Sequence, residues 1–402
     1  MGEHVLVLNT GSSSIKYELL GDGGAHRLTT GLVERIGERE GLVVHRLGDG
    51  REWRWEGRIP DHRAGLEAMR RAFAEQGPGL DGIALAAVGH RVVHGGGFDE
   101  AVLVDDDVIR RIEECIPLAP LHNPAGVTGI RVARTLFPDV PHVAVFDTAF
   151  HRTLPPHART YAVPREWTRD LAVRRYGFHG TSFAYVSRRT AELLGRPVTE
   201  LNMIVLHLGN GASAAAIAGG VSVDTSMGMT PLEDLVMGTR SGDVDPSLPA
   251  YLHRVAGMSA EEVDDALNRR SGMLALAGDR DMREVWRRAD SGDEDARLAI
   301  DVYCHRVRKY VGAYYAVLGR VDAVVFTAGV GEHDARIRER ALAGLERLGI
   351  AVDRERNRSG PPERTISPDG AEVAVLVVPT DEEREIAVQA LAVARRAKDG
   401  RR

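Results

Sequence analysis

Three short loops centred on glycine, each preceded by a run of aliphatic residues, most constrain what this chain can fold into. The runs and their loops occupy residues 5–14, 204–211 and 324–331. Each run is typical of a buried strand that ends in a tight turn. Glycine lets the backbone approach a ligand closely and adopt positive φ, so that successive N–H groups can point at one anion. Three such loops together predict that the chain holds a polyphosphate.

The pattern between the loops alternates strands with helices and repeats itself. Residues 5–36 and 204–223 share one order of strand, glycine turn, strand, turn and strand, which indicates an internal duplication. Strands followed by helices predict an α/β fold with a mixed sheet flanked by helices in each half. Further strands are expected at 140–146 and 373–378. Helices are expected at 61–77, 105–115, 182–194, 260–269, 282–288, 296–318, 337–348 and 382–397.

The length of the chain favours two domains with a cleft between them. A chain of 402 residues exceeds what one core of ordinary size accommodates. The last helix follows a strand of the second half, and we expect it to cross back to the first domain. We therefore predict an N-terminal domain of residues 1–148 completed by residues 385–402, and a nucleotide-binding domain of residues 149–384.

Composition excludes several classes of function. The net charge is −6 and basic residues alternate with acidic ones along the expected helices, so we expect no nucleic-acid partner. Cys115 and Cys304 are the only cysteines, which predicts two small buried side chains rather than a disulfide or a structural metal site. No apolar run approaches the ~20 residues of a membrane span. We therefore expect no membrane association and a cytoplasmic protein.

The common phosphate-binding and hydrolase motifs are missing. The sequence contains no G-x-x-x-x-G-K-[ST], no G-x-G-x-x-G after a strand and no protein-kinase signature. His94-Gly95-Gly96-Gly97 looks like the oxyanion loop of esterases, but no G-x-S-x-G accompanies it. A hydrolase is therefore not favoured.

Polar residues suited to a charged site gather at the ends of apolar segments. Each has an ordinary structural explanation on its own, and the prediction depends on the motifs that contain them, residues 89–96, 146–151, 176–182 and 238–246. These candidate residues are Arg91, His122, Asp147, His179, His207 and Arg240.

In these motifs the chain resembles the acetate kinase family, within the superfamily of sugar kinases, heat-shock chaperone ATPases and actin. The similarity runs from Asn9-Thr10-Gly11-Ser12-Ser13-Ser14 to Thr380-Asp381-Glu382-Glu383 and so covers nearly the whole chain. The resemblance implies ATP:acetate phosphotransfer with ATP and ADP as co-substrates and Mg²⁺, or alternatively Mn²⁺, as cofactor. It also implies two duplicated ribonuclease-H-like (actin-like ATPase) domains, an interdomain cleft and a homodimer.

The resemblance assigns the chemistry to four residues. Acetate and the γ-phosphate are both anionic, and Arg91 and Arg240 supply the positive charge that lets them meet. His179 is expected to be a third donor to the phosphoryl group. Asp147 corresponds to the family's catalytic aspartate. Because acetate is already deprotonated near neutral pH, we favour a role for Asp147 in orienting an arginine or metal-bound water over proton abstraction.

The remaining assignments concern the metal, the nucleotide and the carboxylic acid. Glu382 and Asn9 are the expected Mg²⁺ ligands, and Lys16 is expected to reach a phosphate. The nucleotide is expected to lie along His207, Leu208, Gly209, Asn210, Gly211, Asp281, Met282, Arg283, Gly329, Val330, Gly331, Glu332 and His333. The acid is expected to contact Arg91 and His122, with its methyl group against Val93, Leu121, Phe178 and Pro231.

Three positions depart from the family pattern, and three alternative functions stay open. Asp381 and His333 stand where asparagine is usual, and Phe183 replaces a histidine. Our hypothesis is that Asp381 adds a carboxylate beside the metal and tightens Mg²⁺ binding. The alternatives are a kinase for propionate or another short-chain acid, a pyrophosphate-using variant, and an actin-like or chaperone-like ATPase that switches conformation without a carboxylate substrate.

Overall fold

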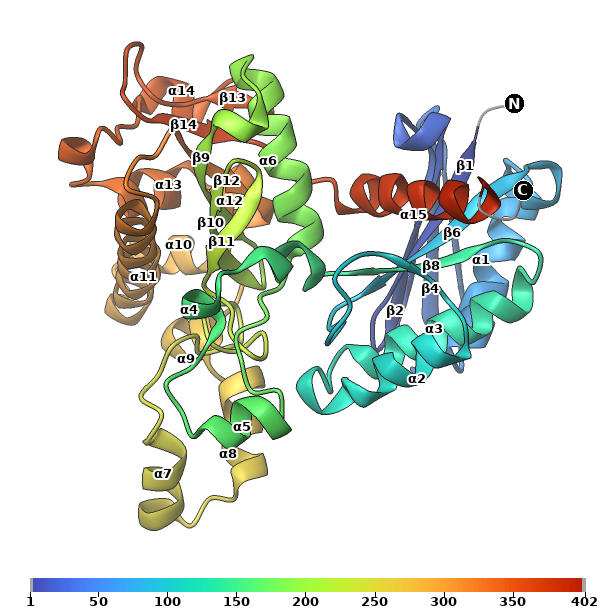
Figure 1. Ribbon diagram of the computed structural model, residues 1–402, viewed down its shortest axis with the longest axis horizontal. Helices are drawn as coiled ribbons and strands as arrows, with labels where there is room; N and C mark the ends of the chain where they lie inside the picture. The colour runs from blue at the N-terminus through green and yellow to red at the C-terminus, as the bar shows by residue number, and fades with distance from the viewer. Residues whose placement is uncertain (1–2, 400–402) are drawn as a thin grey trace. The chain divides into compact units, whose positions relative to one another are not determined.

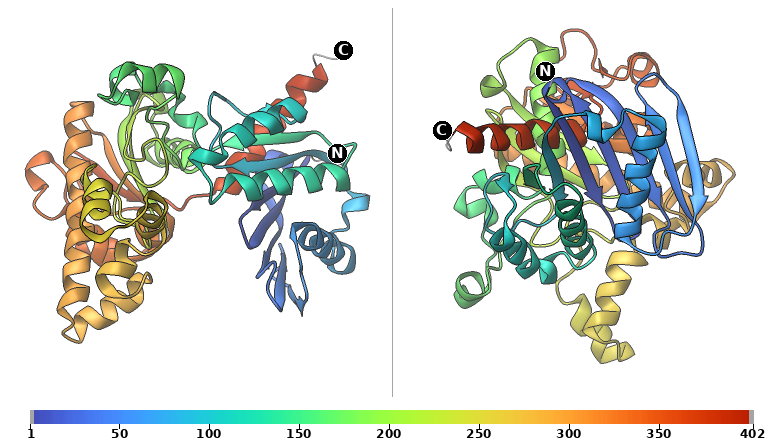
Figure 2. Two further views of the ribbon diagram at one scale, coloured as in Figure 1. Left: turned by 90° about the horizontal axis from the view of Figure 1, so that it is seen from below. Right: turned by 90° about the vertical axis from the view of Figure 1, so that its right-hand side faces the viewer.

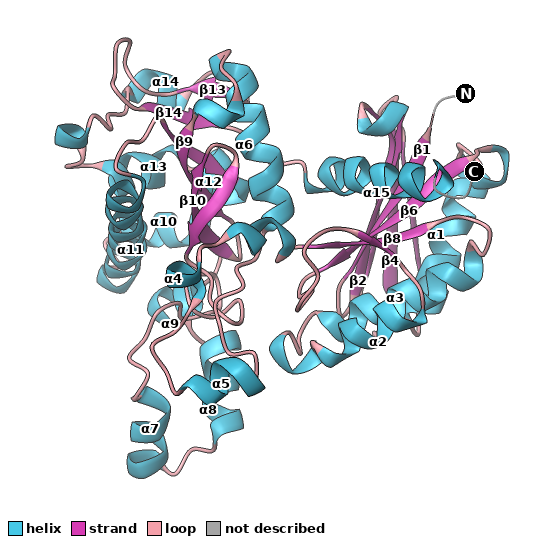
Figure 3. Ribbon diagram, viewed as in Figure 1, coloured by secondary structure: helices cyan, strands magenta, loops and turns pink. Residues whose placement is uncertain are grey.

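The computed structural model describes residues 3–399, which form two compact units. Unit 1 contains the chain up to residue 150 together with residues from 381 onward, and unit 2 contains residues 151–380. Both are α/β units built on a mixed sheet (Figure 1, Figure 3).

Unit 1 is built on a sheet of eight strands in the order β5-β4-β3-β2-β1-β6-β8-β7. Strands β1 to β5 pair antiparallel in sequence order, whereas β6 is parallel to both β1 and β8, and β7 is antiparallel to β8. The strands are β1 (His4–Thr10), β2 (Ser14–Gly21), β3 (His26–Glu34), β4 (Gly41–Leu47), β5 (Glu52–Gly57), β6 (Leu85–Val92), β7 (Val102–Leu103) and β8 (His142–Phe146).

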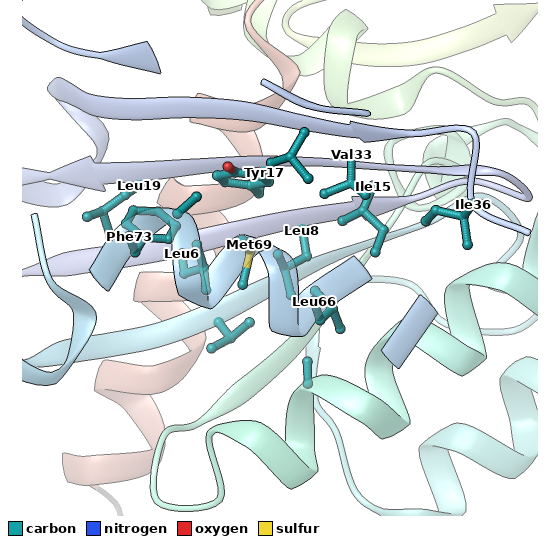
Figure 4. Packing of buried hydrophobic residues seen from close by; sticks show 14 of the residues in the cluster. Leu6, Leu8, Ile15, Tyr17, Leu19, Val33, Ile36, Leu66, Met69 and Phe73 are labelled. Carbon is teal, nitrogen blue, oxygen red and sulfur yellow. The ribbon is translucent and has the colours of Figure 1, made fainter. Parts of the chain in front are cut away.

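Alternation of side chains along β1 gives this sheet two apolar faces. Leu6 and Leu8 face a core shared with α1 (His62–Gln76) and α3 (Asn123–Leu136), seen from close by in Figure 4. Val5 and Val7 face the opposite core, which α15 (Glu382–Asp399) covers. The helix that follows the last strand of unit 2 therefore belongs to the core of unit 1. Helix α2 (Asp106–Glu114) contributes to a third cluster beside α3.

Unit 2 repeats the central strand order of unit 1. Its sheet has the order β11-β10-β9-β12-β14-β13, with β9, β10 and β11 antiparallel and β12 parallel to both β9 and β14. This matches β3-β2-β1-β6-β8 of unit 1 and confirms the predicted duplication. The strands are β9 (Asn202–Leu208), β10 (Ala212–Ala218), β11 (Val221–Thr225), β12 (Ala323–Thr327), β13 (Arg364–Thr365) and β14 (Ala374–Val377).

Helices cover both faces of the unit 2 sheet. Helix α6 (Gly180–Leu194) lies on one side and the long α11 (Glu294–Leu318) on the other (Figure 1, Figure 2). The other helices are α4 (Pro156–Arg159), α5 (Arg165–Asp170), α7 (Leu248–Ala256), α8 (Ala260–Arg269), α9 (Gly272–Ala277), α10 (Met282–Asp290), α12 (Ala328–His333), α13 (Ala335–Leu342) and α14 (Arg354–Arg358).

Most predicted helices are confirmed, and their ends follow local chemistry. Asp61 caps α1 by accepting a hydrogen bond from the Ala64 N–H at 2.8 Å, and Gly77 ends the helix with a φ of 80°. The helix expected at 337–348 is wrong in its second half. It ends at Leu342, because Ala343 leaves the helical region with a ψ of 132° and Gly344 follows with a φ of 85°, and only a 3₁₀ turn follows at Glu346–Leu348.

Two further observations concern the cysteines and the apolar character of the helices. Cys115 and Cys304 are both buried and unbridged, as predicted. Within residues 3–399, no helix has the length and apolar character needed to cross a membrane.

Candidate active site

In unit 1, an arginine and an aspartate meet because two parallel strands end at the same edge of the sheet. Arg91 is the penultimate residue of β6 and Asp147 directly follows β8. The Asp147 N–H donates to the Val92 carbonyl at 3.0 Å, which continues the pairing past the end of the strand. Arg91 then donates from Nε to Oδ1 at 3.1 Å and from Nη2 to Oδ2 at 2.8 Å. Both oxygens of the Asp147 carboxylate therefore accept hydrogen bonds from the one guanidinium group of Arg91.

The local charges keep Arg91 cationic. Burial alone disfavours the charge, but the carboxylates of Asp147 and Glu382 outweigh burial and raise the pKa of Arg91. The Asp147 side chain is 1% exposed, whereas Arg91 retains 19% exposure. Among the contacts within residues 3–399, the bonds of Arg91 to Asp147 use Nε and Nη2, which leaves Nη1 for a ligand.

A small cavity in unit 1 brings together five of the predicted residues. Its volume is about 240 Å³, and its lining includes Asn9, Lys16, Arg91, Val93 and His122. Leu121, also predicted to contact the acid, does not line it and is 36% exposed. Basic and apolar side chains in a space of this size suit a small carboxylic acid.

The loop that looks like an esterase oxyanion motif has a structural role. The Gly95 N–H donates to Thr148 Oγ1 at 3.1 Å, and the Gly96 N–H donates to Nδ1 of His94 at 3.0 Å. Asn123 bonds both the N–H and the carbonyl of His94. These N–H groups donate hydrogen bonds to side chains within unit 1. This agrees with the sequence analysis, which did not favour a hydrolase.

In unit 2, two histidines stack beside the second glycine loop. The rings of His179 and His207 have centroids 4.1 Å apart and planes 15° apart. Each ring is fixed through Nδ1, which lies 2.8 Å from the hydroxyl of Ser213 for His179 and of Ser182 for His207. His179 precedes α6 with a φ of 57°, a strained conformation for a residue with a side chain. The ring of Phe183 packs edge-on against that of His207, with ring centroids 6.4 Å apart.

Arg240 lies next to His179, and Gly211 leaves room for both. A Cβ at Gly211 would be 2.7 Å from Nη2 of Arg240 and 3.4 Å from Nε2 of His179. Arg240 donates from Nη1 to the Pro231 carbonyl at 2.6 Å. Burial lowers the pKa of Arg240, and Asp234 partly offsets this. Three residues predicted to act on the phosphoryl group or the phosphates are thus neighbours in unit 2.

The positive φ expected of the glycines in the three loops is absent. Neither Gly11 nor Gly211 lies in the left-handed region, and the same holds for Gly209, Gly329 and Gly331. In the third loop the left-handed residue is Ala328, with a φ of 63°, and α12 begins there directly after β12. In sequence, a helix that begins directly after a strand looks like a glycine turn, because in both cases small residues follow an aliphatic run.

Comparison with protein families shows which family has a sequence of this kind. The model of the acetokinase family matches residues 4–388. The chain belongs to the acetokinase family. The predicted resemblance is thereby confirmed.

Curated relatives and solved structures agree with this assignment. The chain is 60% identical to acetate kinase of Streptomyces coelicolor over 394 residues, covering 97% of this chain and 96% of that protein. It is 58% identical to acetate kinase of Clavibacter michiganensis over 390 residues, covering 96% and 98%. Its sequence is 42% identical to that of Porphyromonas gingivalis acetate kinase, whose crystal structure matches 97% of this chain and 99% of that chain with a TM-score of 0.90. A propionate kinase from Francisella tularensis is also 42% identical, covering 97% and 100% with a TM-score of 0.92.

Apart from Lys16 in β2 of unit 1, the residues expected to contact the nucleotide fall in unit 2, in three places. In the loop of residues 207–211, the Gly209 N–H donates to the Gly211 carbonyl at 2.9 Å, and Leu208 is fully buried, so only its backbone can face a ligand. Asp281 caps α10, next to Met282, and also binds the Arg283 side chain, whose hydrogen bonds lower the pKa of Asp281 to about 2. Residues 329–333 lie in α12, with His333 exposed.

Sequence reasoning missed the residue that anchors α12. Arg338 is 1% exposed, and its Nη1 donates to the carbonyls of Gly331 and Glu332 at 2.8 and 2.9 Å. Its Nε donates to Asn357 Oδ1 at 2.7 Å. Burial lowers the pKa of Arg338 to about 10. It sits in a run of surface arginines, and only its place on the apolar stripe beside Ile337 could have singled it out.

The expected metal ligands fit a hard cation. Asn9 lies in β1 and Glu382 begins α15, both within unit 1. Among residues 3–399, no group of three or more histidine, cysteine or acidic side chains is arranged to hold a metal ion. Mg²⁺ keeps several of its waters and needs only one or two protein oxygens, so an amide and a carboxylate are a suitable donor set.

The contact between Gly211 and Arg240 yields a prediction. Gly211→Ala should lower kcat by about 10²-fold, because the new methyl group displaces the guanidinium by roughly an ångström. The backbone at Gly211 is not left-handed, so alanine adds no backbone strain, and the circular dichroism spectrum should be unchanged. Gly312→Ala in α11 is the control, since a Cβ there meets nothing within 4 Å. Equal kcat values for the two variants would contradict the placement of Arg240.

Proposed function

We propose that this protein transfers the γ-phosphoryl group of ATP reversibly to acetate, giving ADP and acetyl phosphate. An acetate oxygen forms the new bond to phosphorus, while the bond from phosphorus to the bridging oxygen breaks and its electron pair leaves on ADP. The observation that carries the proposal is Arg91, a cation held by Asp147 that lines the 240 Å³ cavity of unit 1. Membership of the acetokinase family agrees with it.

In this proposal, the residues that bind and orient the acid come mostly from unit 1, with Phe178 and Pro231 from unit 2. Arg91 and His122 receive the carboxylate, and Val93 contacts the methyl group, with Leu121, Phe178 and Pro231 contributing the other apolar contacts. Carboxylic acids are ionised near neutral pH, so no base is required for attack. Asp147 then orients Arg91, a role that the two-pronged contact between them supports.

The residues of unit 2 act on the phosphates. Arg240 and His179 donate to the equatorial oxygens of the phosphoryl group, where charge accumulates in a loose transition state. The loop of residues 207–211 holds the remaining phosphates, and the start of α10 and α12 contact the nucleoside. A divalent cation at Asn9 and Glu382, with Lys16 nearby, would neutralise charge on the phosphate oxygens. From the family resemblance, we also propose that unit 2 is the nucleotide-binding domain and that the protein is a cytoplasmic homodimer.

Propionate is the second candidate acid. The similarity to the propionate kinase of Francisella tularensis favours it, and an apolar pocket discriminates by only ~1 to 3 kcal/mol per methylene group. We expect activity with both acids and a higher kcat/KM for acetate.

One assay tests the function. ATP is supplied with acetate, propionate or butyrate, and acyl phosphate is trapped with hydroxylamine while ADP is measured in parallel. We expect acyl hydroxamate and ADP in equal amounts, and neither product without an acid. Hydrolysis of ATP that is independent of acid, without acyl phosphate, would instead indicate a conformational ATPase. A parallel reaction contains pyrophosphate in place of ATP. Formation of acyl phosphate in that reaction would indicate the pyrophosphate-using variant.

A further inference from the structure

An arginine in unit 1 joins the start of α15 to the central sheet. Arg27, on β3, donates from Nε to Glu18 Oε2 at 2.7 Å and from Nη2 to Asp381 Oδ1 at 2.9 Å. Glu18 lies on β2 and Asp381 directly precedes Glu382, the first residue of α15. The side chains of Glu18 and Asp381 are 14% and 20% exposed, whereas that of Arg27 is 45% exposed, so the two carboxylates are largely buried and the guanidinium that joins them lies at the surface.

Asp381 has a second contact that fixes the first turn of α15. Its Oδ1 also accepts the Arg384 N–H at 3.1 Å, and its carbonyl accepts the Glu385 N–H at 3.1 Å. This is the contact pattern of a helix N-cap. Oδ1 of Asp381 therefore has two donors within unit 1. This arrangement suggests a role different from the direct contact with the metal that we expected from the sequence.

The surrounding charges make Arg27 important at this position. Burial, together with the charge of Glu383, raises the pKa of Glu18 to about 7 despite its contact with Arg27. Glu382 and Glu383 are consecutive residues of the first turn of α15, and Glu383 lines the same cavity as Glu18 and Arg27. Four carboxylates thus lie close together where α15 begins, and without Arg27 their mutual repulsion would act on the first turn.

The body of α15 is located in a different way. Ile386 and Ala390 pack against β6, where a Cβ at Gly89 would lie 2.9 Å from Ile386 Cγ2 and 3.2 Å from Ala390 Cβ. This apolar contact fixes the axis of the helix from its second turn onward. The first turn, which carries Glu382, depends on the polar contacts of Asp381.

We infer that Arg27, bridging Glu18 and Asp381, is a positioning residue that holds the first turn of α15 and so aims the Glu382 carboxylate at the metal. This inference rests on the proposed role of Glu382. It gives Asp381 an indirect role, through Arg27 and the helix cap.

The two roles for Asp381 predict opposite effects of Arg27→Gln. If Asp381 touched the metal, removal of Arg27 would free it and tighten binding. If Arg27 positions Glu382, Arg27→Gln should weaken Mn²⁺ binding about five-fold and raise the KM for Mg·ATP by more than it lowers kcat. Arg46→Gln is the matched control, because Arg46 lines the same 360 Å³ cavity as Arg27 and Glu18 but pairs with Glu52.

Two measurements on the full-length protein test the inference. Mn²⁺ binding with ADP present is followed through the electron paramagnetic resonance signal of free Mn²⁺, corrected by a titration without protein. Hydrogen exchange of residues 382–386 is followed by mass spectrometry. Arg27→Gln should accelerate this exchange at least five-fold and leave exchange in α3 unchanged, whereas Arg46→Gln should change neither readout.

Unchanged or tighter Mn²⁺ binding in Arg27→Gln, or unchanged exchange at 382–386, overturns the inference. Glu382→Gln separates this failure from a failure of the proposed function. If Glu382→Gln binds Mn²⁺ as the wild type does, the proposed metal site is wrong, and the link from Arg27 to the metal is lost with it. Arg27→Lys keeps the charge but cannot bridge two carboxylates as a fork, and it should restore only part of the affinity.

Discussion

Arg91→Gln should reduce kcat by about 10³- to 10⁵-fold, the range typical for an arginine that acts on a phosphoryl group in transfer. Lysine should not replace Arg91, because an ammonium cannot bind Asp147 through two nitrogens and keep a third for the substrate. Steady-state rates of acyl hydroxamate formation measure the loss. A kcat within ten-fold of the wild type would contradict the proposed role.

The same substitution should also destabilise unit 1, and this effect has to be separated from catalysis. Removing one partner of a buried ion pair typically costs about 3 to 5 kcal/mol, because the other charge is left without a partner. Asp147 is 1% exposed, so this cost applies. The double variant Arg91→Gln with Asp147→Asn carries neither charge. It should recover most of the lost free energy of unfolding, measured by urea denaturation, and stay inactive.

Arg240→Gln should reduce kcat by a similar factor without the loss of stability. The described contacts of Arg240 include one hydrogen bond, to the Pro231 carbonyl, and no ion pair. Because burial already disfavours the charge of Arg240, a neutral side chain should leave the urea midpoint unchanged or raise it. Activity and stability should therefore separate in this variant, in contrast to Arg91→Gln.

A small-molecule rescue sharpens this second experiment. In Arg240→Ala, the space left by the side chain adjoins Gly211 and His179. Added guanidinium chloride at millimolar concentration should restore part of kcat, whereas equal sodium chloride should not. Absence of rescue combined with a lowered urea midpoint would show that Arg240 acts by supporting the fold.

The sequence predicted best those features that depend on local pattern. Arg91 and Asp147 stand at the ends of two apolar runs, and parallel pairing of those runs brings the ends together. Asp61 and Gly77 mark the ends of α1 by capping chemistry alone. The duplication was visible because both halves begin with the same order of strands and turns.

What the sequence did not predict depends on contacts between distant residues. Arg27 and Asp381 are 354 positions apart, and neither belongs to a motif that indicates pairing. Ser213 and Ser182, which fix the two stacked histidines, look like ordinary strand and helix residues. The left-handed residue of the third loop is Ala328 rather than glycine, and the glycine pattern of that loop gives no sign of this.

The place of α15 in unit 1 has a consequence for biosynthesis. The side chains of Val5, Val7, Val143 and Val145 are covered by a helix that the ribosome makes roughly 240 residues later than β8. During translation, unit 2 is finished while one face of the first sheet is still bare, and this face is the natural target for a chaperone. A nascent chain that stops short of α15 would lack the cover of that sheet, so an unfinished chain would be aggregation-prone, and it would also lack Glu382, the proposed metal ligand.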